Sequence, residues 1–473
     1  MKIMRLTLLL FIIPYTFLCI TSCSSDDDKN SVLTVTIELL DFETTVIENQ
    51  NQGFIIGSLE TTIANSDQTP TYTIVEQSVS DAIILEGANL IINDATAFDL
   101  NTNTQITGQV SAMTEGVFDT ASFTLTITND PAAFITIWET TIPNEEISIY
   151  TDANFDYDYT IHWGDGTVAT NQTGDATHIY TKPAMHKLSI VGKFPSIINS
   201  DDSANAAKLL TIENWGNIAW EHMFGAFENC INLKLNASDI PDLTSVTSMS
   251  RMFRNATSFN GDLSNWDVSN VYQFDSTFAN ASAFNGGISN WDISKATSMA
   301  FMFLGATSFN QDIGNWDVSN ITRLESTFNG ASSFNQNISN WDVSNVSNMS
   351  LLFKDATAFN QDISSWDVSN TIGMVRIFEG ATSFNQDISN WDIGNIINMW
   401  AMFKNATSFN QDISNWDVSG VTSMLNLFEN ASTFNQDLSD WMTINVTNCT
   451  NFSNNSALTQ ANKPTAGDCD FTN

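Results

Sequence analysis

Positive charge is scarce in this sequence. The 473 residues contain 16 Lys and Arg against 53 Asp and Glu, which gives a formal net charge of −37 at pH 7. A surface with such an excess of carboxylates repels the phosphates of nucleic acids and anionic lipid head groups. The composition therefore excludes a nucleic-acid-binding protein and favours partners that carry positive charge.

Histidine and cysteine are also scarce, with four His and five Cys in the whole chain. Cys230, Cys449 and Cys469 are too scattered for a zinc motif or a dense disulfide framework, and Cys230 is expected to be a buried structural residue. Cys449 and Cys469 are a candidate disulfide, and the sequence does not decide whether they pair. No Ser/His/Asp or Cys/His set stands out, so we expect that the protein is not an enzyme.

An apolar run long enough to span a membrane is missing as well. The apolar stretch at residues 6–20 is short and contains a proline. Two positive charges precede it and Cys23 follows it after small residues, which resembles a signal peptide with a bacterial lipobox. The resemblance implies that residues 1–22 are removed and that Cys23 is acylated. The alternative is a plain secretory signal in which Cys23 stays unmodified.

Residues 23–32 form an acidic tether after the lipobox. Their Ser-Ser-Asp-Asp-Asp run resembles the tags that direct some Gram-negative lipoproteins to the outer face of the membrane. Two or more acyl chains would anchor such a protein stably. We therefore expect a lipoprotein that is anchored in the cell outer membrane and faces the exterior.

Tryptophan recurs every 25 residues in the second half of the chain. It occupies positions 266, 291, 316, 341, 366, 391, 416 and 441. We number each position by its distance from this Trp, so that +8 lies eight residues after it. Apolar residues recur at −7, −3, +2, +5, +8, +12 and +15 in nearly every unit. Repetition at this period is typical of a solenoid, whose neighbouring units bury one continuous core.

The spacing of the apolar positions changes character within each unit. Positions +5, +8, +12 and +15 lie three or four residues apart, which predicts one face of a short helix. The segment around the Trp, residues 313–318 in one unit, is short, aromatic and β-branched, which predicts a strand. One strand and one helix per unit would give a leucine-rich-repeat-like solenoid.

Two recurring segments carry a resemblance to a known family. They are Phe-Asn-Gln-Asp-Ile-Ser-Asn-Trp-Asp-Val-Ser-Asn and Met-Phe-Lys-Asn-Ala-Thr-Ser-Phe, and residues 209–446 contain their variants. These segments closely resemble the BspA-like leucine-rich-repeat surface proteins. The resemblance implies an extracellular protein, and some members of that family are adhesins toward host or matrix proteins. The repeated motif contains no binding residues, so it assigns none.

Several columns of the repeat allow more than one interpretation. Asn at −6 and Asp at +1 are expected to bond to turn backbone, with the Asp ahead of a helix start. A second Asp column at −4, interrupted by Gly287 and Asn337, is a candidate calcium ladder. The Trp column is expected to be core, with a sugar-stacking platform as the alternative. Variable residues such as Arg323, Arg376 and Trp400 make the expected helical flank the better candidate for binding a partner.

Residues 33–130 contain short alternating stretches separated by turn residues, which is typical of a β-sandwich. They resemble a cadherin-type module through their Ile-Glu-Asn, Ala-Phe-Asp and Ile-Thr-Asn-Asp segments. The resemblance implies calcium ligands at Glu48, Asp99 and Asp130. Leu-Asn follows Asp99 where an acidic partner is expected, so a metal-free sandwich is the alternative.

Residues 131–199 resemble a PKD-like immunoglobulin-type module through their Trp-Gly-Asp-Gly-Thr and His-Ile-Tyr segments. The Gly-Asp-Gly predicts a tight turn after a strand, and Trp163 is expected in the core. His162, His178 and His186 also fall in this module. A metal site would require these three side chains to converge.

The predicted fold class follows from these features. It is a multidomain chain with two all-β sandwich modules followed by an α/β leucine-rich-repeat-like solenoid of about eight 25-residue units. The solenoid is expected over residues 247–446. A cap with a degenerate repeat is expected at 200–246, and a C-terminal cap at 447–473.

The sequence predicts a cell-surface lipoprotein that acts as an adhesin or ligand-binding module for an extracellular protein or glycan. The alternative is a surface protein that captures glycans or other nutrients for a partner uptake system. A secreted hydrolase is the hypothesis that the sequence favours least. No cofactor is expected apart from the candidate calcium, and neither the ligand nor the oligomeric state follows from the sequence.

Overall fold

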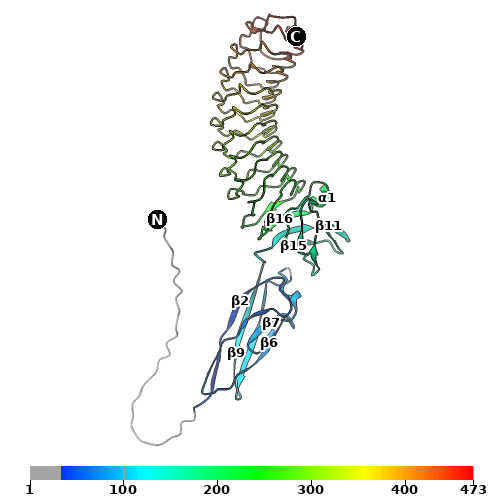
Figure 1. Cartoon of the computed structure of the whole chain (residues 1–473), viewed down its shortest axis with the longest axis vertical. Coiled ribbons are helices and arrows are strands. Elements are labelled where there is room, and N and C mark those ends of the chain that lie inside the picture. The colour runs from blue at the N-terminus through cyan, green and yellow to red at the C-terminus, as the bar shows by residue number, and fades with distance from the viewer. Residues whose placement is uncertain (1–32, 101, 472–473) are drawn as a thin grey trace, which may run out of the picture.

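The computed structural model describes residues 33–100 and 102–471, which form two β-sandwiches followed by a long stack of coils (Figure 1). The predicted signal peptide and the acylated Cys23 lie outside these residues. Among the described helices, none is long and apolar enough to cross a membrane.

The regular elements are short. The strands are β1 (Thr36–Leu39), β2 (Phe42–Ile47), β3 (Ile55–Ser58), β4 (Thr61–Ala64), β5 (Thr71–Gln77), β6 (Ile83–Glu86), β7 (Asn89–Ile92), β8 (Gln105–Thr114), β9 (Val117–Thr128), β10 (Phe134–Glu139), β11 (Glu145–Ile149), β12 (Asp158–His162), β13 (Val168–Gln172), β14 (Ala176–Tyr180), β15 (Met185–Lys193), β16 (Leu209–Asn214) and β17 (Lys234–Leu235). The helical elements are η1 (Ala95–Phe98), α1 (Ser203–Ala206) and η2 (Gln460–Asn462).

The first sandwich has a four-stranded sheet of order β2-β9-β8-β5, a three-stranded sheet of order β3-β7-β6 and the pair β1-β4. β8 and β9 form a long antiparallel hairpin, and β2 pairs in parallel with β9. Buried and exposed residues alternate along β9, because successive side chains of a strand point to opposite faces. The inward side chains, such as Val110, Phe123 and Leu125, build a core of their own.

The second sandwich has a six-stranded sheet of order β13-β12-β15-β10-β16-β17 and the pair β11-β14. Trp163 is confirmed as core and is 2% exposed. The turn after it requires glycine, because Gly164 has a φ of +77° and lies against the backbone of Lys187. The sheet includes a strand beyond the module boundary expected between residues 199 and 200, since β16 pairs with β10.

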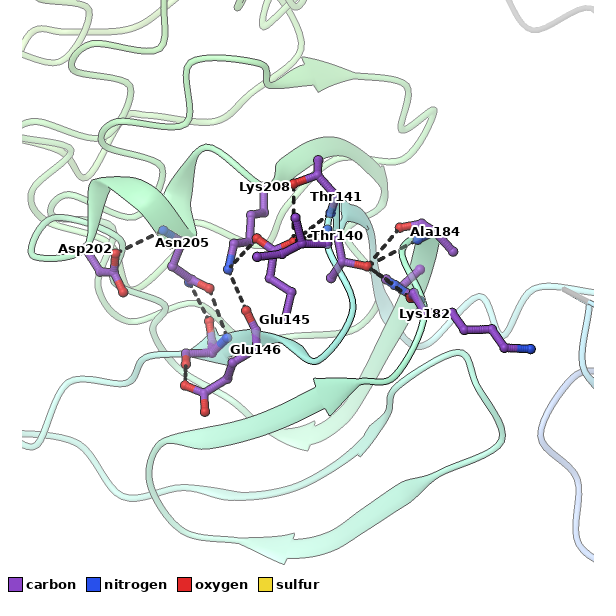
Figure 2. Close-up of polar contacts among 12 residues, drawn as sticks. Thr140, Thr141, Glu145, Glu146, Lys182, Ala184, Asp202, Asn205 and Lys208 are labelled. Atoms are coloured by element: carbon purple, nitrogen blue, oxygen red, sulfur yellow. Dashed lines mark hydrogen bonds and ion pairs between the residues drawn. The ribbon is translucent and has the colours of Figure 1, made fainter.

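Side chains after that boundary hold the chain to the second sandwich (Figure 2). The Asn205 amide accepts from the Ser148 N–H at 3.0 Å and donates to the Ser148 carbonyl at 2.8 Å. Lys208 Nζ lies 3.2 Å from the Glu145 carboxylate and donates to the Glu146 carbonyl at 2.6 Å. One hydrophobic core consequently extends from the second sandwich through the stack of coils to its C-terminal end.

The prediction of an α/β solenoid is wrong. Residues 247–446 are described throughout, and they contain no helix and no strand longer than a single bridged residue. Each unit is a succession of turns, and parallel one-residue bridges at position +7 join most neighbouring coils. The one α-helix of the described chain is the four-residue α1, which precedes the repeats.

The backbone hydrogen bonds explain why the coils are not helical. In the unit of Trp316, the N–H groups at +8, +10, +12 and +14 donate to carbonyls of the next coil at 2.7–3.0 Å. The N–H groups at +11, +13 and +15 donate to the carbonyl three residues back. Alternate groups therefore close turns and join coils, which leaves none for the i to i−4 pattern of a helix.

Two positions in each unit have left-handed backbone. Residues at +10 and +14 have positive φ in every unit, for example Ser326 at 55° and Gly330 at 73°. Position +14 is always Asn, Gly or Asp, the residues that tolerate this conformation: Asn280, Gly305, Gly330, Asp355, Gly380, Asn405, Asn430 and Asn455. This column was the sequence signal against a helix, because all three residues are weak helix formers.

The predicted core columns are confirmed. The repeated apolar residues are each 5% exposed or less. Phe328 at +12 packs against the following Phe334 with ring centroids 3.9 Å apart, and against Phe353 of the next coil at 5.8 Å. The side chains at these positions are therefore buried as the spacing predicted, although the backbone forms turns where a helix was expected.

The end of the stack is closed by a covalent bond. Cys449 and Cys469 form a disulfide with Cα atoms 6.1 Å apart, which folds the C-terminal tail back over the last coil. Phe471 is 4% exposed and packs against Phe452 with ring centroids 4.8 Å apart. Cys230 is fully buried in the degenerate first unit, as expected, and burial raises the pKa of its thiol.

Candidate binding surface

Glu48, Asp99 and Asp130, the residues expected as calcium ligands, lie near the junction of the two sandwiches. The positive charge beside Glu48 is the ammonium of Lys187. Glu48 Oε1 lies 2.7 Å from Lys187 Nζ, and its other oxygen accepts from the Leu100 N–H at 3.3 Å. Asp130 Oδ1 accepts from the Ala132 N–H at 2.8 Å, and Asp99 ends η1. In the residues described, no group of three His, Cys, Asp or Glu side chains is arranged for a metal. Carboxylate oxygens are ligands of the kind that calcium prefers, but these three are not grouped around one point, and Lys187 holds an oxygen of Glu48.

The three histidines of the second sandwich have separate partners or environments. His178 Nε2 lies 2.7 Å from the Asp165 carboxylate, and His186 Nε2 lies 2.8 Å from the Thr140 hydroxyl. Burial lowers the pKa of His162, although Asp99 and Asp130 act in the opposite direction. These contacts hold side chains within the module, and they do not form a metal centre among the residues that the structure describes.

The Asn column at −6 is a structural ladder. The side-chain oxygen of each Asn accepts the backbone N–H of the next Asn at 2.7–3.0 Å, from Asn260 to Asn435. The last Asn accepts from the Thr459 N–H of the C-terminal cap at 2.9 Å. These exposed amides therefore satisfy turn backbone along the whole stack.

Both Asp columns serve the turns. Asp at +1 accepts the N–H two residues later at 3.0–3.1 Å, and Asp at −4 does the same at 2.9–3.0 Å. The expected backbone bond of the +1 column is confirmed, but no helix follows it. The Ser side chains and N–H groups that donate to Asp367 and Asp417 hold the pKa of these carboxyls below the ordinary value.

The Trp column belongs to the core, as expected. Its indoles are 2–5% exposed, and from Trp291 onward each Nε1–H donates at 2.9–3.3 Å to the carbonyl at −3 in the preceding coil. A buried indole with a satisfied donor presents no face to a sugar. The repeated Trp residues are therefore not a stacking platform for glycans.

One variable flank of the solenoid does expose apolar side chains. Ile372 and Ile397 occupy position +6 of adjacent coils and are 65% and 61% exposed, where most other units have Thr or Ser. Trp400 is 37% exposed, and the Arg376 guanidinium lies over its ring at 5.0 Å from the centroid. We call these four residues the Trp400 patch.

The main-chain hydrogen bonds between the coils of Trp366 and Trp391 are interrupted beside the Trp400 patch. In every other neighbouring pair from Trp266 onward, the N–H at +8 donates to the carbonyl at +7 of the next coil. Both coils here are fully described, yet Met374 N–H makes no such bond to Asn398 and the bridge at +7 is missing. The bond between Arg376 N–H and the Trp400 carbonyl remains, at 2.9 Å. The patch thus coincides with a local interruption of the main-chain ladder.

The comparison with protein families concerns this repeat region. A family model described as "Mycoplasma protein of unknown function, DUF285" matches residues 218–320, 309–399 and 370–465, which together span more than half of the chain. The chain belongs to the DUF285 family. The DUF285 matches confirm a repeat protein and attach no activity to it. Among curated proteins, no relative matches.

Solved structures with some similarity to this DUF285 chain are cadherin ectodomains. The protocadherin gammaB7 EC3-6 cis-dimer structure has 10% identity and a TM-score of 0.19, and the alignment covers 32% of this chain and 46% of that chain. The human desmocollin-1 ectodomain has 10% identity and a TM-score of 0.19, with 34% and 42% covered. Mouse protocadherin-24 EC1-3 has 12% identity and a TM-score of 0.17, with 32% and 67% covered.

The sequence indicates part of this surface. Variation between units marks Arg376 and Trp400, whereas Ile372 and Ile397 were not predicted, although their departure from the Thr or Ser of position +6 was visible. Lys187 at the sandwich junction was not predicted either. No local pattern marks that residue, since its partner Glu48 is 139 residues away in the chain.

Proposed function

We propose that this protein is a surface-displayed binding protein whose solenoid engages an extracellular protein through the Trp400 patch. The single observation that supports the proposal is the exposure of two Ile side chains and a Trp on one flank, where position +6 has Thr or Ser in most other units. Aliphatic side chains gain free energy when a partner removes them from water. Trp and Arg are also the residues that most often dominate binding energy in protein interfaces.

The chemistry of the patch favours a protein over a glycan. A sugar stacks on an aromatic face and needs polar groups around it, and Trp400 supplies such a face with Arg376 beside it. Two exposed isoleucines next to that face are better matched by apolar side chains of a protein. Because the net charge of the chain is −37, we expect the partner to carry basic residues around its apolar contact. Glycan capture for an uptake system is the second candidate, and Trp400 supports it.

The rest of the proposal concerns display at the cell surface. Acylation of Cys23 would anchor the chain in the outer membrane, and the tether and two sandwiches would separate the solenoid from the bilayer. The resemblance to BspA-like surface proteins supports this arrangement, and binding without catalysis fits a chain with no evident catalytic set. Replacing Cys23→Ala should release the protein from the membrane fraction, and protease treatment of intact cells should cut the solenoid of the unmodified protein.

The binding test uses substitutions to residues that occur at the same positions in other units. Because Ile372→Thr, Ile397→Thr and Trp400→Ser introduce such residues, the coils should keep their fold. We expect the combined variant to weaken binding to a panel of extracellular matrix proteins by about tenfold or more. Surface plasmon resonance with the full mature chain would measure this change.

The control is Tyr272→Thr, which changes an exposed residue at position +6 outside the patch. It should bind like the unmodified chain. Retention on a glycan array that depends on Trp400 but not on the isoleucines would favour the glycan hypothesis. Cleavage of a polysaccharide or peptide by the purified protein would contradict the proposal.

A further inference from the structure

A cleft of about 590 Å³ lies where the two sandwiches meet. Residues 48–51, 94–97, 99, 102 and 103 contribute to one wall, and residues 162 and 164–168 with Lys187 contribute to the other. Lys187 lies within β15 of the second sandwich, and its ammonium contacts Glu48, the residue that follows β2 in the first. It also donates to the Asn129 side chain in the linker between the modules. One side chain thus connects both sandwiches and the segment that joins them.

The backbone around Glu48 is held within the first sandwich. Glu48 N–H donates to the Thr128 carbonyl at 2.8 Å, and the next residue bonds to the Phe98 carbonyl. The side chains of Glu48 and Lys187 are 2% and 11% exposed. In the described part of the chain, this is the one ion pair between the two sandwiches.

We propose that the Lys187 ammonium is the permanent cation of this joint and fixes the angle between the sandwiches without a metal ion. A carboxylate buried this deeply needs a positive partner. A divalent ion could supply that charge only if the ammonium left, because the two cations would compete for the same oxygen of Glu48 and repel each other. The inference does not depend on the proposed function of the solenoid.

The proposal predicts a joint whose geometry is indifferent to calcium. Spin labels at Gln68→Cys and Thr170→Cys, both at exposed positions, would report the distance between the sandwiches in the full mature chain. With Cys19 and Cys23 replaced by Ser, the remaining native cysteines are Cys230, which is fully buried, and the Cys449–Cys469 disulfide, so labelling should be selective. We expect one narrow distance distribution that is the same in millimolar calcium and in chelator. A distribution that shifts between these two conditions would overturn the proposal.

Substitution of the ammonium tests its role directly. Lys187→Met keeps an unbranched side chain, one atom shorter, and removes the charge, so the distance distribution should broaden, and Lys187→Arg should keep it narrow. Glu48→Gln changes the other partner and should also broaden it while the second sandwich stays unaltered. Near-ultraviolet circular dichroism of the full chain would verify that each variant folds.

The matched control is Lys193→Met in the same strand, since Lys193 Nζ is half exposed and lies 4.0 Å from a fully exposed Asp156 carboxylate. It should leave the distribution unchanged. If Lys187→Met and Glu48→Gln both gave the distribution of the unmodified chain, the ammonium would not hold the joint and the proposal would be wrong.

Discussion

The sandwiches and the coils bury similar apolar side chains but satisfy their backbones differently. In the first sandwich, β8 and β9 pair continuously from Gln105 and Thr126 to Thr114 and Val117. In the solenoid, each bridge is one residue long, and alternate N–H groups close turns or reach the next coil. The comparison teaches that apolar spacing fixes which side chains are buried, whereas the path of the backbone depends on where its hydrogen bonds go.

The largest predicted effect on stability comes from removing a buried ring from either of the two hydrophobic cores. Phe328→Ala removes a fully buried ring that lies 5.7 and 5.8 Å from the equivalent rings of its neighbours, and should cost about 3–5 kcal/mol. Phe123→Ala in the first sandwich should cost a similar amount. Because the two cores are separate, calorimetry should show that each substitution lowers only its own unfolding transition. A shift of both transitions by either variant would show that the cores unfold together.

The second-largest effect on stability is expected from the disulfide, which lies in the solenoid and has no counterpart in the described part of the first sandwich. The disulfide closes a 20-residue separation at the end of the solenoid, and loops of this size contribute about 3 kcal/mol when cross-linked. The double variant Cys449→Ser and Cys469→Ser should therefore lower the solenoid transition in calorimetry. The transition of the first sandwich, where the described residues contain no cysteine, serves as the internal control and should not move.

Gly330→Ala distinguishes the turn-built coil from a helix by the sign of its effect. In a helix this change would stabilise the protein by about 1 kcal/mol. Gly330 has a φ of 73° with room for a Cβ, so we expect a loss of about 1–2 kcal/mol from the left-handed backbone alone. Urea denaturation followed by tryptophan fluorescence would measure the difference. Ser326→Gly at the other left-handed position should act in the opposite direction.

The smallest predicted effect is on the stability of the solenoid at low pH. Hydrogen bonds from Ser389 hold the pKa of Asp387 below its ordinary value, against repulsion from Asp362 and Asp412. A lowered folded-state pKa means that this stabilisation is complete above the ordinary carboxyl pKa and is lost as the pH falls through the lowered one. Asp387→Asn should therefore reduce the acid sensitivity of the solenoid slightly.

The same column contains a natural precedent for this variant. Asn337 accepts the Ser339 N–H at 2.9 Å, so an amide preserves the turn. Denaturation midpoints at neutral pH and below the ordinary carboxyl pKa would test the effect. A large loss of stability at neutral pH would show that the charge itself matters.

Much of the candidate surface could be predicted from the sequence and part of it could not. Unit-to-unit variation identified Arg376 and Trp400, because a residue that departs from a repeat is not needed by the repeat. The stacking of Arg376 on Trp400 and the open ladder beside them depend on contacts between coils, which lie about 25 residues apart in the chain. Glu48 and Lys187 lie 139 residues apart in the chain, so no local pattern predicts their contact.

The sequence by itself determined the 25-residue period, the buried columns at Phe, Trp, Met and Ala, and the turn chemistry of the Asn and Asp columns. These features depend on side-chain polarity and on local hydrogen bonds, both of which are written in short segments. Only the tertiary structure decided that apolar residues three and four apart lie on turns and not on a helix. The deciding bonds join one coil to the next, and the left-handed residues at +10 and +14 point their N–H groups toward those distant carbonyls.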